Sequence, residues 1–306
     1  MEYSIGTDLG GTRIKFVIID VHGHVIDRQA LSITDDAASW SGKIKELVHS
    51  TIKQRQQPRC IGLAAPGLSA NDYRSIAFMP GRLQGLEGLD WTDFVDCGIP
   101  VSVLNDAHAA LFGEYWQGAA AGLKHAFLLT LGTGVGGAVL ANGKMMMGTI
   151  GRFGHLGHIS LDSEGERDST LTPGSLEDCI GDKTISKRSA GHYTTTKELI
   201  EDVKRNDPQA CDIWLKSVEK LACGISSLIN VLDPEAVILG GGIIQAGKML
   251  FEPLDKALEK YEWRPGGHRV QILPAKLGDY AGAIGAVRFA LNQNVNNGRL
   301  IKNEET

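Results

Sequence analysis

Two glycine-rich turns in this sequence have the composition of phosphate-binding turns. The first follows Asp8 and contains Gly10, Gly11 and Thr12, and the second begins Gly132-Thr133-Gly134. Glycines leave the backbone N–H groups of a turn uncovered, and successive N–H groups can cup an anion. Any tight hairpin also needs glycine, but two such turns in corresponding places, both rich in glycine and threonine, favour phosphate binding.

Charged side chains beside the first turn would complete a phosphate site. A carboxylate at Asp8 would repel a phosphate, but it can hold Mg²⁺ or a water bound to Mg²⁺, since this hard cation prefers oxygen ligands. Lys15, just after the turn, can add a positive charge. The pattern therefore predicts a phosphate site in which Asp8 can hold Mg²⁺, directly or through water.

Two other glycine motifs resemble better-known nucleotide sites and fail on their context. Residues 132–137 satisfy GxGxxG, but a dinucleotide fingerprint must open a helix, and here Ala138 begins an apolar run that ends in an Asn-Gly hairpin. Residues 242–249 come one residue short of a P-loop and carry Met249 where a hydroxyl group must bind magnesium. The sequence argues against both kinds of site.

Strands must position both glycine turns. Apolar runs bounded by turn residues predict strands, and apolar residues at helical spacing predict helices. The predicted strands are residues 3–9, 14–20, one ending near 33, 60–65, 101–104, 126–131, 138–141, 144–147, 236–239 and one near 270. The predicted helices are 38–56, 106–115, 212–232, one after 242, and 280–293. Because the strand–turn–strand unit occurs twice, we expect an α/β protein with two similar domains flanking a central cleft.

Length, composition and charge narrow the class of protein. The 306 residues can form two domains, and 42% hydrophobic with 22% charged residues is ordinary for a soluble protein. A net charge of −5 without a basic stripe argues against nucleic acid as a partner, and no apolar run reaches the roughly 18 residues of a membrane span. Five cysteines without a CxxC pair predict a reduced, cytoplasmic protein.

Eight motifs, in order along the chain, resemble the ROK family of sugar kinases. They are DLGGTRIK at 8–15, AAPG at 64–67, NDAHAA at 105–110, LGTGVGGAV at 131–139, GHLGHISLD at 154–162, SLEDCIG at 175–181, DPEAVILGGGI at 233–243 and LGDYAGAIGA at 277–286. The resemblance runs from about residue 4 to residue 290. It implies duplicated actin-like ATPase domains of the ribonuclease H-like type, one formed by residues 1–117 plus 290–306 and the other by residues 118–289.

The resemblance also implies an activity, namely ATP-dependent phosphorylation of a hydroxyl group of a hexose or hexose derivative. Glucokinases and N-acetylhexosamine kinases of the family do this with ATP and Mg²⁺, and relatives suggest a homodimer. The alternative is a non-catalytic sugar- or nucleotide-binding regulator. Repressors of the family carry an additional N-terminal helix-turn-helix domain, for which a first strand starting at Tyr3 leaves no room, so we expect a kinase.

The resemblance assigns roles to single residues. Asp106 would be the catalytic base that accepts the proton of the sugar hydroxyl, although from the residues alone a helix cap is the stronger interpretation. The sugar would be bound by Asn105, Gly67, His155, His158 and Glu177. The phosphates of ATP would be bound by Gly10, Gly11, Thr12, Lys15, Thr133 and Gly134, and Asp8 would hold the Mg²⁺ of the nucleotide. The adenosine would approach Gly240, Gly241 and Gly242.

The sequence departs from the family pattern where zinc is usual. The family usually has a CxCGxxGC zinc motif after its Glu-x-Gly-His segment, but residues 163–175 contain no cysteine. A structural zinc site needs four nitrogen or sulfur ligands, so we expect no zinc. His155 stands where the family usually has the glutamate. His155 and His158 could form a metal pair, but hydrogen bonding to sugar or backbone is the stronger interpretation.

A third departure is Arg82, which stands where the family usually has a sugar-binding asparagine. A guanidinium group is suited to carboxylate or phosphate, which predicts a substrate with an acidic or otherwise unusual substituent. An Arg82 that faces solvent or pairs with Glu87 is an equally good interpretation.

Overall fold

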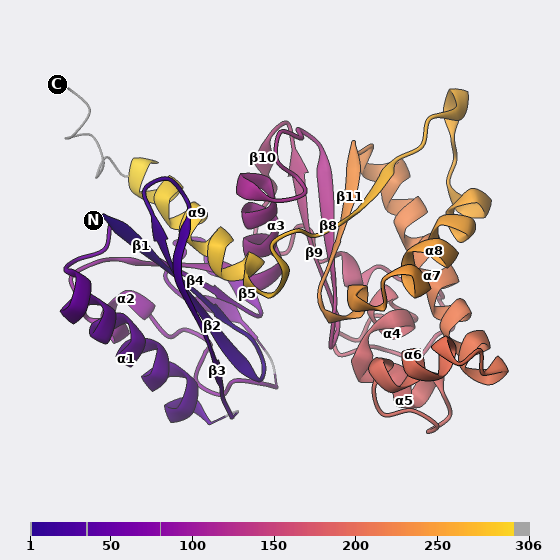
Figure 1. Cartoon of the computed structure of the whole chain (residues 1–306), viewed down its shortest axis with the longest axis horizontal. Helices are drawn as coiled ribbons and strands as arrows, with labels where there is room; N and C mark the ends of the chain where they lie inside the picture. Colours follow the sequence, from indigo (N-terminus) through magenta and orange to yellow (C-terminus); the bar gives the residue numbers. More distant parts are fainter. Residues whose placement is uncertain (1, 35, 80, 297–306) are drawn as a thin grey trace. The chain divides into compact units, whose positions relative to one another are not determined.

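The computed structural model of the protein describes residues 2–34, 36–79 and 81–296 (Figure 1). The chain forms two compact units. The first contains the described residues of 1–122, 145–153 and 276–306, and the second contains residues 123–144 and 154–275. In the described part of the chain, no helix is both long and apolar enough to cross a membrane.

The first unit is built on a five-stranded sheet in the order β3-β2-β1-β4-β7. Its strands are β1 (Tyr3–Leu9), β2 (Arg13–Asp20), β3 (Val25–Ser32), β4 (Ile61–Ala65) and β7 (Val101–Asn105). The first three form antiparallel hairpins, whereas β4 and β7 run parallel to β1. All seven residues of β1 are buried, as expected of a central strand covered on both faces.

The sheet of the second unit repeats this design, with the strand order β10-β9-β8-β11-β12. Its strands are β8 (Ala126–Leu131), β9 (Val135–Ala141), β10 (Lys144–Met145), β11 (Ala236–Gly240) and β12 (Gln271–Pro274). Again the first two form an antiparallel hairpin, and β11 and β12 run parallel to one another and to the first strand. In both sheets the strands follow the order third, second, first, fourth and fifth, so the predicted duplication of an α/β fold is confirmed.

Nine helices of the described residues surround the sheets. They are α1 (Ala37–Arg55), α2 (Trp91–Val95), α3 (Asp106–Gln117), α4 (Leu176–Ile180), α5 (Ile185–Arg188), α6 (Thr196–Lys204), α7 (Pro208–Leu232), α8 (Lys248–Tyr261) and α9 (Ala281–Asn296). Short 3₁₀ segments are η1 (Leu156–His158), η2 (Asp182–Thr184), η3 (Gly242–Ala246), η4 (Pro265–Gly267) and η5 (Gly278–Tyr280), and β5 (Leu68–Ser69) pairs with β6 (Ile76–Phe78). The long helix α7 begins four residues before the predicted start, because Asp207 caps it by accepting the N–H of Ala210 (2.8 Å).

The C-terminal helix α9 packs its backbone directly on the first sheet. A Cβ atom on Gly6 would clash with the carbonyl oxygen of Ala283, and one on Gly62 would clash with that of Ala286. Glycine in β1 and β4 therefore permits the close approach of this helix. The first unit takes up the chain from Lys276 onward, whereas the sequence suggested a return near residue 290.

Two further contacts organise the first unit around α3. The ring of His108 in α3 donates from Nε2 to the carbonyl of Phe153 (2.7 Å), which ties segment 145–153 to this unit. The buried carboxylate of Glu114 accepts the backbone N–H groups of Ala119 (2.6 Å), Lys276 (3.0 Å) and Leu277 (2.8 Å). These donors lie close to the point where the chain first leaves the first unit, after residue 122, and at the point where it last returns, at Lys276. One side chain therefore holds the backbone at two of the four crossings between the units.

Replacing Glu114 by alanine should lower the free energy of unfolding of the first unit by about 3 kcal/mol, because three backbone N–H groups would lose their buried acceptor. Glu235 is the matched control, since it accepts the N–H groups of Lys124 (2.6 Å) and His125 (2.9 Å) from an exposed position in the second unit. Water can replace Glu235, so Glu235→Ala should cost less. Urea unfolding measures both variants, and equal losses would contradict the importance of burial at Glu114.

Candidate active site

Two acidic residues of the first unit, Asp8 and Asp106, lie at the carboxyl ends of parallel strands. Asp8 of β1 pairs with Ala64 of β4, and Ala64 pairs with Leu104 of β7, so Asp106 follows directly after the same edge of the sheet. Neighbouring strands are about 4.8 Å apart, which places the backbones of Asp8 and Leu104 about 10 Å apart. The structure therefore brings the predicted metal residue and the predicted base to one edge.

Asp8 lies at the start of the first glycine turn and is 8% exposed. Its Oδ2 atom is 3.5 Å from Nζ of Lys15, across the hairpin. Burial raises the pKa of the Asp8 carboxyl group, and the Lys15 ammonium group opposes this rise. The N–H of Gly10 donates to the carbonyl of Arg13 (2.9 Å) and closes the turn. The two predicted charges therefore flank the predicted turn.

The structure separates the roles of the neighbours Asn105 and Asp106. Asn105 is the cap of α3, because its Oδ1 accepts the N–H groups of Ala107 (3.0 Å) and His108 (3.1 Å). Its Nδ2 donates to the carbonyl of Gly67 (2.9 Å), so the two predicted sugar residues Asn105 and Gly67 are in contact. Asp106 is the first residue of the helix, and the capping role considered for it from the sequence is filled by Asn105.

The carboxyl group of Asp106 has the electrostatics of a base. Burial and the negative charge of Asp8 raise the pKa of Asp106 to about 6, although the N–H of Ala107, 2.8 Å from Oδ1, stabilises the ionised form. Such a carboxylate is ionised at neutral pH and binds a proton more readily than an ordinary aspartate does. The site can therefore accept a proton from a neighbouring hydroxyl group.

Arg82 lies over the first glycine turn. Its Nη2 donates to the carbonyl of Gly11 (3.2 Å), and a Cβ on Gly11 would clash with the guanidinium group. The next residue, Leu83, is buried in the core and has a left-handed backbone (φ 50°), which anchors the exposed arginine. Glu87 instead accepts the N–H of Met79 (2.5 Å). The structure thus places the cation of Arg82 beside the turn predicted to bind phosphate.

The second glycine turn is held by the helices that follow it. The carbonyls of Gly132 and Thr133 accept the N–H groups of Asp182 and Lys183 (both 2.9 Å). Glu177 of α4 accepts the N–H of Val135 through Oε2 (2.9 Å), and its carboxylate fills the space beside Gly134. One oxygen of the predicted sugar-binding Glu177 is therefore engaged with the turn itself.

The three predicted adenosine residues lie where β11 ends. Gly241 has a positive φ of 87°, and a Cβ there would clash with the backbone of Leu131. Glycine is therefore required at this position by the fold. At Gly242, which begins η3, a Cβ would meet no atom within 4 Å, so the backbone there is open on that side.

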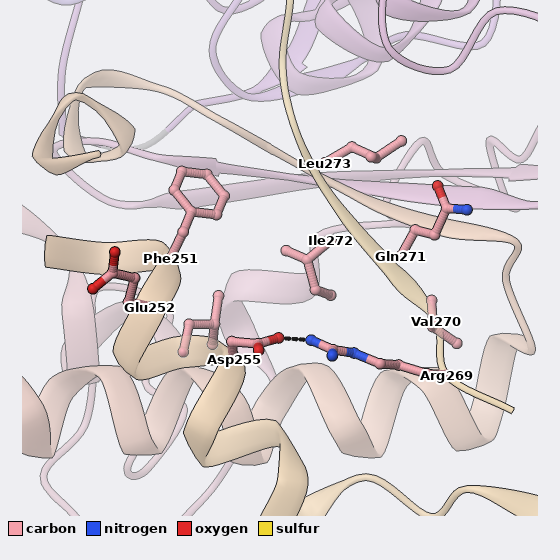
Figure 2. A pocket seen from close by; sticks show the side chains of 9 residues that line it. Phe251, Glu252, Asp255, Arg269, Val270, Gln271, Ile272 and Leu273 are labelled. Carbon is pink, nitrogen blue, oxygen red and sulfur yellow. Dashed lines mark ion pairs between the residues drawn. The ribbon is translucent and has the colours of Figure 1, made fainter. Parts of the chain in front are cut away.

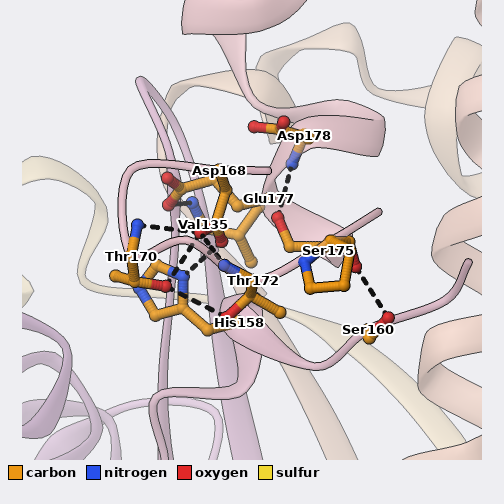
Figure 3. Close-up of polar contacts among 10 residues, drawn as sticks. Val135, His158, Ser160, Asp168, Thr170, Thr172, Ser175, Glu177 and Asp178 are labelled. Atoms are coloured by element: carbon orange, nitrogen blue, oxygen red, sulfur yellow. Dashed lines mark hydrogen bonds and ion pairs between the residues drawn. The ribbon is translucent and has the colours of Figure 1, made fainter. Parts of the chain in front are cut away.

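His155 directly precedes the short segment η1 and His158 is its last residue. His158 has a partner that the sequence analysis missed. Its Nδ1 is 2.8 Å from Oδ2 of Asp168, a contact drawn in Figure 3. The only signal for this pair in the sequence is an acidic residue in the segment that replaces the family's zinc motif. Among the described residues, no three His, Cys, Asp or Glu side chains form a cluster that could hold a metal ion.

A cavity of about 490 Å³ in the second unit lies between α8 and β12 (Figure 2). Apolar side chains such as Phe251, Leu254 and Ile272 line it, and Asp255 forms an ion pair with Arg269 there. None of the predicted site residues lines this cavity.

Two sheets of the same strand order, each with a glycine turn after its first strand, are the features by which this chain can be compared with known proteins. Residues 4–293 match the profile of the ROK family, so the chain belongs to this family, as its motifs predicted. The predicted fold class, the duplicated actin-like ATPase fold of these sugar kinases, is confirmed as well.

Relatives of known structure and name cover nearly the whole chain. The structure of a ROK hexokinase from Thermus thermophilus is 27% identical with a TM-score of 0.83, over 96% of this chain and 99% of that one. A ROK family glucokinase from Streptomyces griseus, in complex with glucose and AMPPNP, is 25% identical with a TM-score of 0.79, over 95% and 99%. An N-acetylmannosamine kinase of Vibrio cholerae serotype O1 is 30% identical, over 95% and 99%.

The electrostatics of the site can be tested without any substrate. The Asp106 carboxyl group should titrate with a midpoint near pH 6, because burial and Asp8 both disfavour its ionised form. Carboxyl ¹³C NMR of the wild type, with the spectrum of Asp106→Asn to assign the signal, measures the midpoint. A midpoint near the ordinary aspartate value of about 3.9 would show that these influences are absent.

Proposed function

We propose that the protein transfers the γ-phosphoryl group of ATP to a hydroxyl group of a hexose or hexose derivative. The observation that carries the proposal is the carboxyl group of Asp106, with a pKa of about 6, at the same sheet edge as the first glycine turn. The family supports it, since one relative is named an N-acetylmannosamine kinase and another was solved with glucose and AMPPNP, an analogue of ATP.

In this proposal Asp106 acts as the general base. Its carboxylate accepts the proton of the sugar hydroxyl group as that oxygen forms a bond to the γ-phosphorus atom. The bond between this phosphorus and the β–γ bridging oxygen breaks, and ADP leaves. Asn105 caps α3 and thereby fixes the backbone that carries Asp106. In this mechanism Asp106 only accepts a proton, and no covalent bond forms between the enzyme and the phosphoryl group.

The phosphate groups of ATP would be bound by the two glycine turns. Gly11 and Thr12 would supply backbone donors in the first turn, Gly10 closes the turn through its N–H bond to Arg13, and Lys15 and Arg82 add positive charge beside it. In the second turn Thr133 and Gly134 would bind the terminal phosphates, and Gly240, Gly241 and Gly242 would pack against the adenosine.

Asp8 is suited to bind Mg²⁺, directly or through a water molecule. One largely buried carboxylate is enough, because Mg²⁺ in nucleotide sites takes most of its ligands from phosphate oxygens and water. Bound there, the ion would neutralise charge on the phosphate groups. Lys15, 3.5 Å from Asp8, would hold the carboxylate ionised for this purpose.

The sugar would be bound by Asn105, Gly67, His155, His158 and Glu177. The position of Arg82 keeps two substrate classes open, namely neutral hexoses and hexoses with an acidic substituent. With a neutral hexose, the guanidinium group of Arg82 would bind only the phosphate groups at the first turn. With an acidic hexose it would also contact the acidic substituent.

We further propose a homodimer, testable by sedimentation, and a cytoplasmic location that suits the five free cysteines.

ADP release with Mg-ATP should appear on at least one member of a panel of neutral, N-acetylated and acidic hexoses. If Arg82 contacts an acidic substituent, Arg82→Asn should raise KM for acidic sugars about tenfold and leave neutral sugars unchanged. Plain glucose as the best substrate would refute an acid-specific role of Arg82. Silence across the panel, with sugar or ATP still bound in calorimetry, would favour a non-catalytic binding protein.

Asp106→Asn should lower kcat about 10³-fold while the affinity for ATP is retained, because the asparagine side chain has the shape of aspartate but cannot act as a base.

For the wild type, kcat/KM should fall about tenfold for each pH unit below the Asp106 pKa of about 6, where the base is protonated. Steady-state kinetics measure both effects. Asp212→Asn, at an exposed carboxylate paired with Lys216, is the control and should change neither. A wild-type kcat in the Asp106→Asn variant would show that Asp106 is not the catalytic base.

A further inference from the structure

A loop of the second unit, residues 160–175, is organised around one buried carboxylate. Its ends are joined by hydrogen bonds from Leu161 N to Gly174 O (2.8 Å) and from Leu176 N to Ile159 O (3.0 Å). Between residues 160 and 171, all of which the structure describes, Asp168 is the only buried residue, and its side chain is 0% exposed. Since a buried charge needs partners, the loop must supply them.

Asp168 accepts at least four hydrogen bonds (Figure 3). Its Oδ1 accepts the N–H groups of Thr170 (2.8 Å) and Thr172 (3.0 Å) and the hydroxyl group of Thr170 (2.8 Å). Its Oδ2 accepts from Nδ1 of His158 (2.8 Å). Three of these donors belong to the loop and the fourth belongs to η1, so the carboxylate ties the loop to His158.

These contacts determine which nitrogen of His158 carries a proton. Burial alone would raise the pKa of Asp168, but hydrogen bonds from His158, Thr170 and Thr172 hold it at about 2. An ionised carboxylate can only accept hydrogen bonds, so Nδ1 of His158 must be the protonated nitrogen. In the neutral ring Nε2 is then a hydrogen-bond acceptor.

The segment that carries His158 is fixed against the strand that leaves the second glycine turn. A Cβ on Gly157 would clash with the carbonyl of Val135 in β9, and Leu156 lies against Gly137 of the same strand. The side chain of His158 is nevertheless 26% exposed. The ring is therefore held in place on its Asp168 side while part of it remains accessible to a ligand.

We propose that Asp168 is a positioning residue that closes the 160–175 loop without a metal and presents Nε2 of His158 as an acceptor for a substrate hydroxyl group. The proposal rests on the proposed role of His158 in sugar binding. It assigns a function to Asp168, which no sequence motif marked. It also makes His158 specific for a hydroxyl that donates its hydrogen to the ring.

The variant Asp168→Asn tests the tautomer. Its Oδ1 can keep the three donors from Thr170 and Thr172, and its NH₂ group then faces Nδ1 of His158. Nδ1 must become an acceptor, so the ring proton should move to Nε2. Long-range ¹H–¹⁵N spectra at about pH 8.5, above the ordinary histidine pKa of about 6.5, distinguish the two tautomers. His158→Gln assigns the signals.

The wild type should show a protonated Nδ1 and an unprotonated Nε2, and Asp168→Asn should show the reverse. A wild-type ring protonated on Nε2 alone would overturn the proposal, even if the variant does not fold. These spectra require no turnover. The tautomer of His158 can therefore be determined even if the protein shows no kinase activity, and the two proposals can fail separately.

Kinetics on the best sugar of the panel test the positioning role. Asp168→Asn should raise KM for the sugar about tenfold, the cost of one reversed hydrogen bond, and leave KM for ATP unchanged. If no sugar is turned over, the sugar affinity from calorimetry replaces KM. Thr170→Val is the matched control, because it removes one hydrogen bond to Asp168 but leaves the His158 contact. An equal rise of KM in both variants would reduce Asp168 to a structural role and overturn the proposal.

Discussion

The positions of Asp8 and Asp106 depend on the parallel register of β1, β4 and β7. This register aligns Asp8 with Leu104 and sends both neighbouring chain segments out of the sheet at the same edge. Two carboxyl groups so placed repel one another, which helps to raise the pKa of Asp106. A slip of one residue in any of the three strands would turn these side chains to the other face. The electrostatics of the proposed base are therefore set by backbone hydrogen bonds.

Small residues make this arrangement compact. The helices α3 and α9 approach one another so closely that a Cβ on Gly285 would clash with the carbonyl of Ala109, and one on Gly113 would clash with that of Ala281. Such contact leaves little freedom for α3, whose first residue is Asp106. Glycine thus serves at least two purposes in this chain: it forms turns with a positive φ, as at Gly241, and it lets neighbouring backbones approach one another, as at Gly285.

Much of the fold could be predicted from the sequence because its signals are local. Apolar runs beside glycine turns marked both hairpins, and the long apolar strands agree with the structure within a few residues. The short helix α6 was missed, although Thr195 and Glu198 form a capping box that the sequence displays. Helices α2 and α4 have only five residues each, too few for a helical period to be recognised.

The sequence could nominate residues for the candidate site, but it could not give their contacts. Asn and Asp are equally good helix caps, so only the structure could assign the cap to Asn105. The position of Arg82 depends on the left-handed backbone of Leu83, which no propensity announces. Asp168 is one of several acidic residues in an exposed, polar segment, and its burial arises from hydrogen bonds that form only when the loop closes.

The hydrogen bond between Asp168 and His158 affects the conditions under which the 160–175 loop keeps its structure. A loop closed by thiolates and zinc depends on metal supply and is open to attack by oxidants. A loop closed by a carboxylate and an imidazole ring needs only a medium that is not strongly acidic, since the Asp168 pKa of about 2 lies below the ordinary aspartate value. The hydrogen bonds that hold this loop at Asp168 involve neither a thiolate nor a metal ion, so they do not depend on metal supply or on the redox state of cysteine.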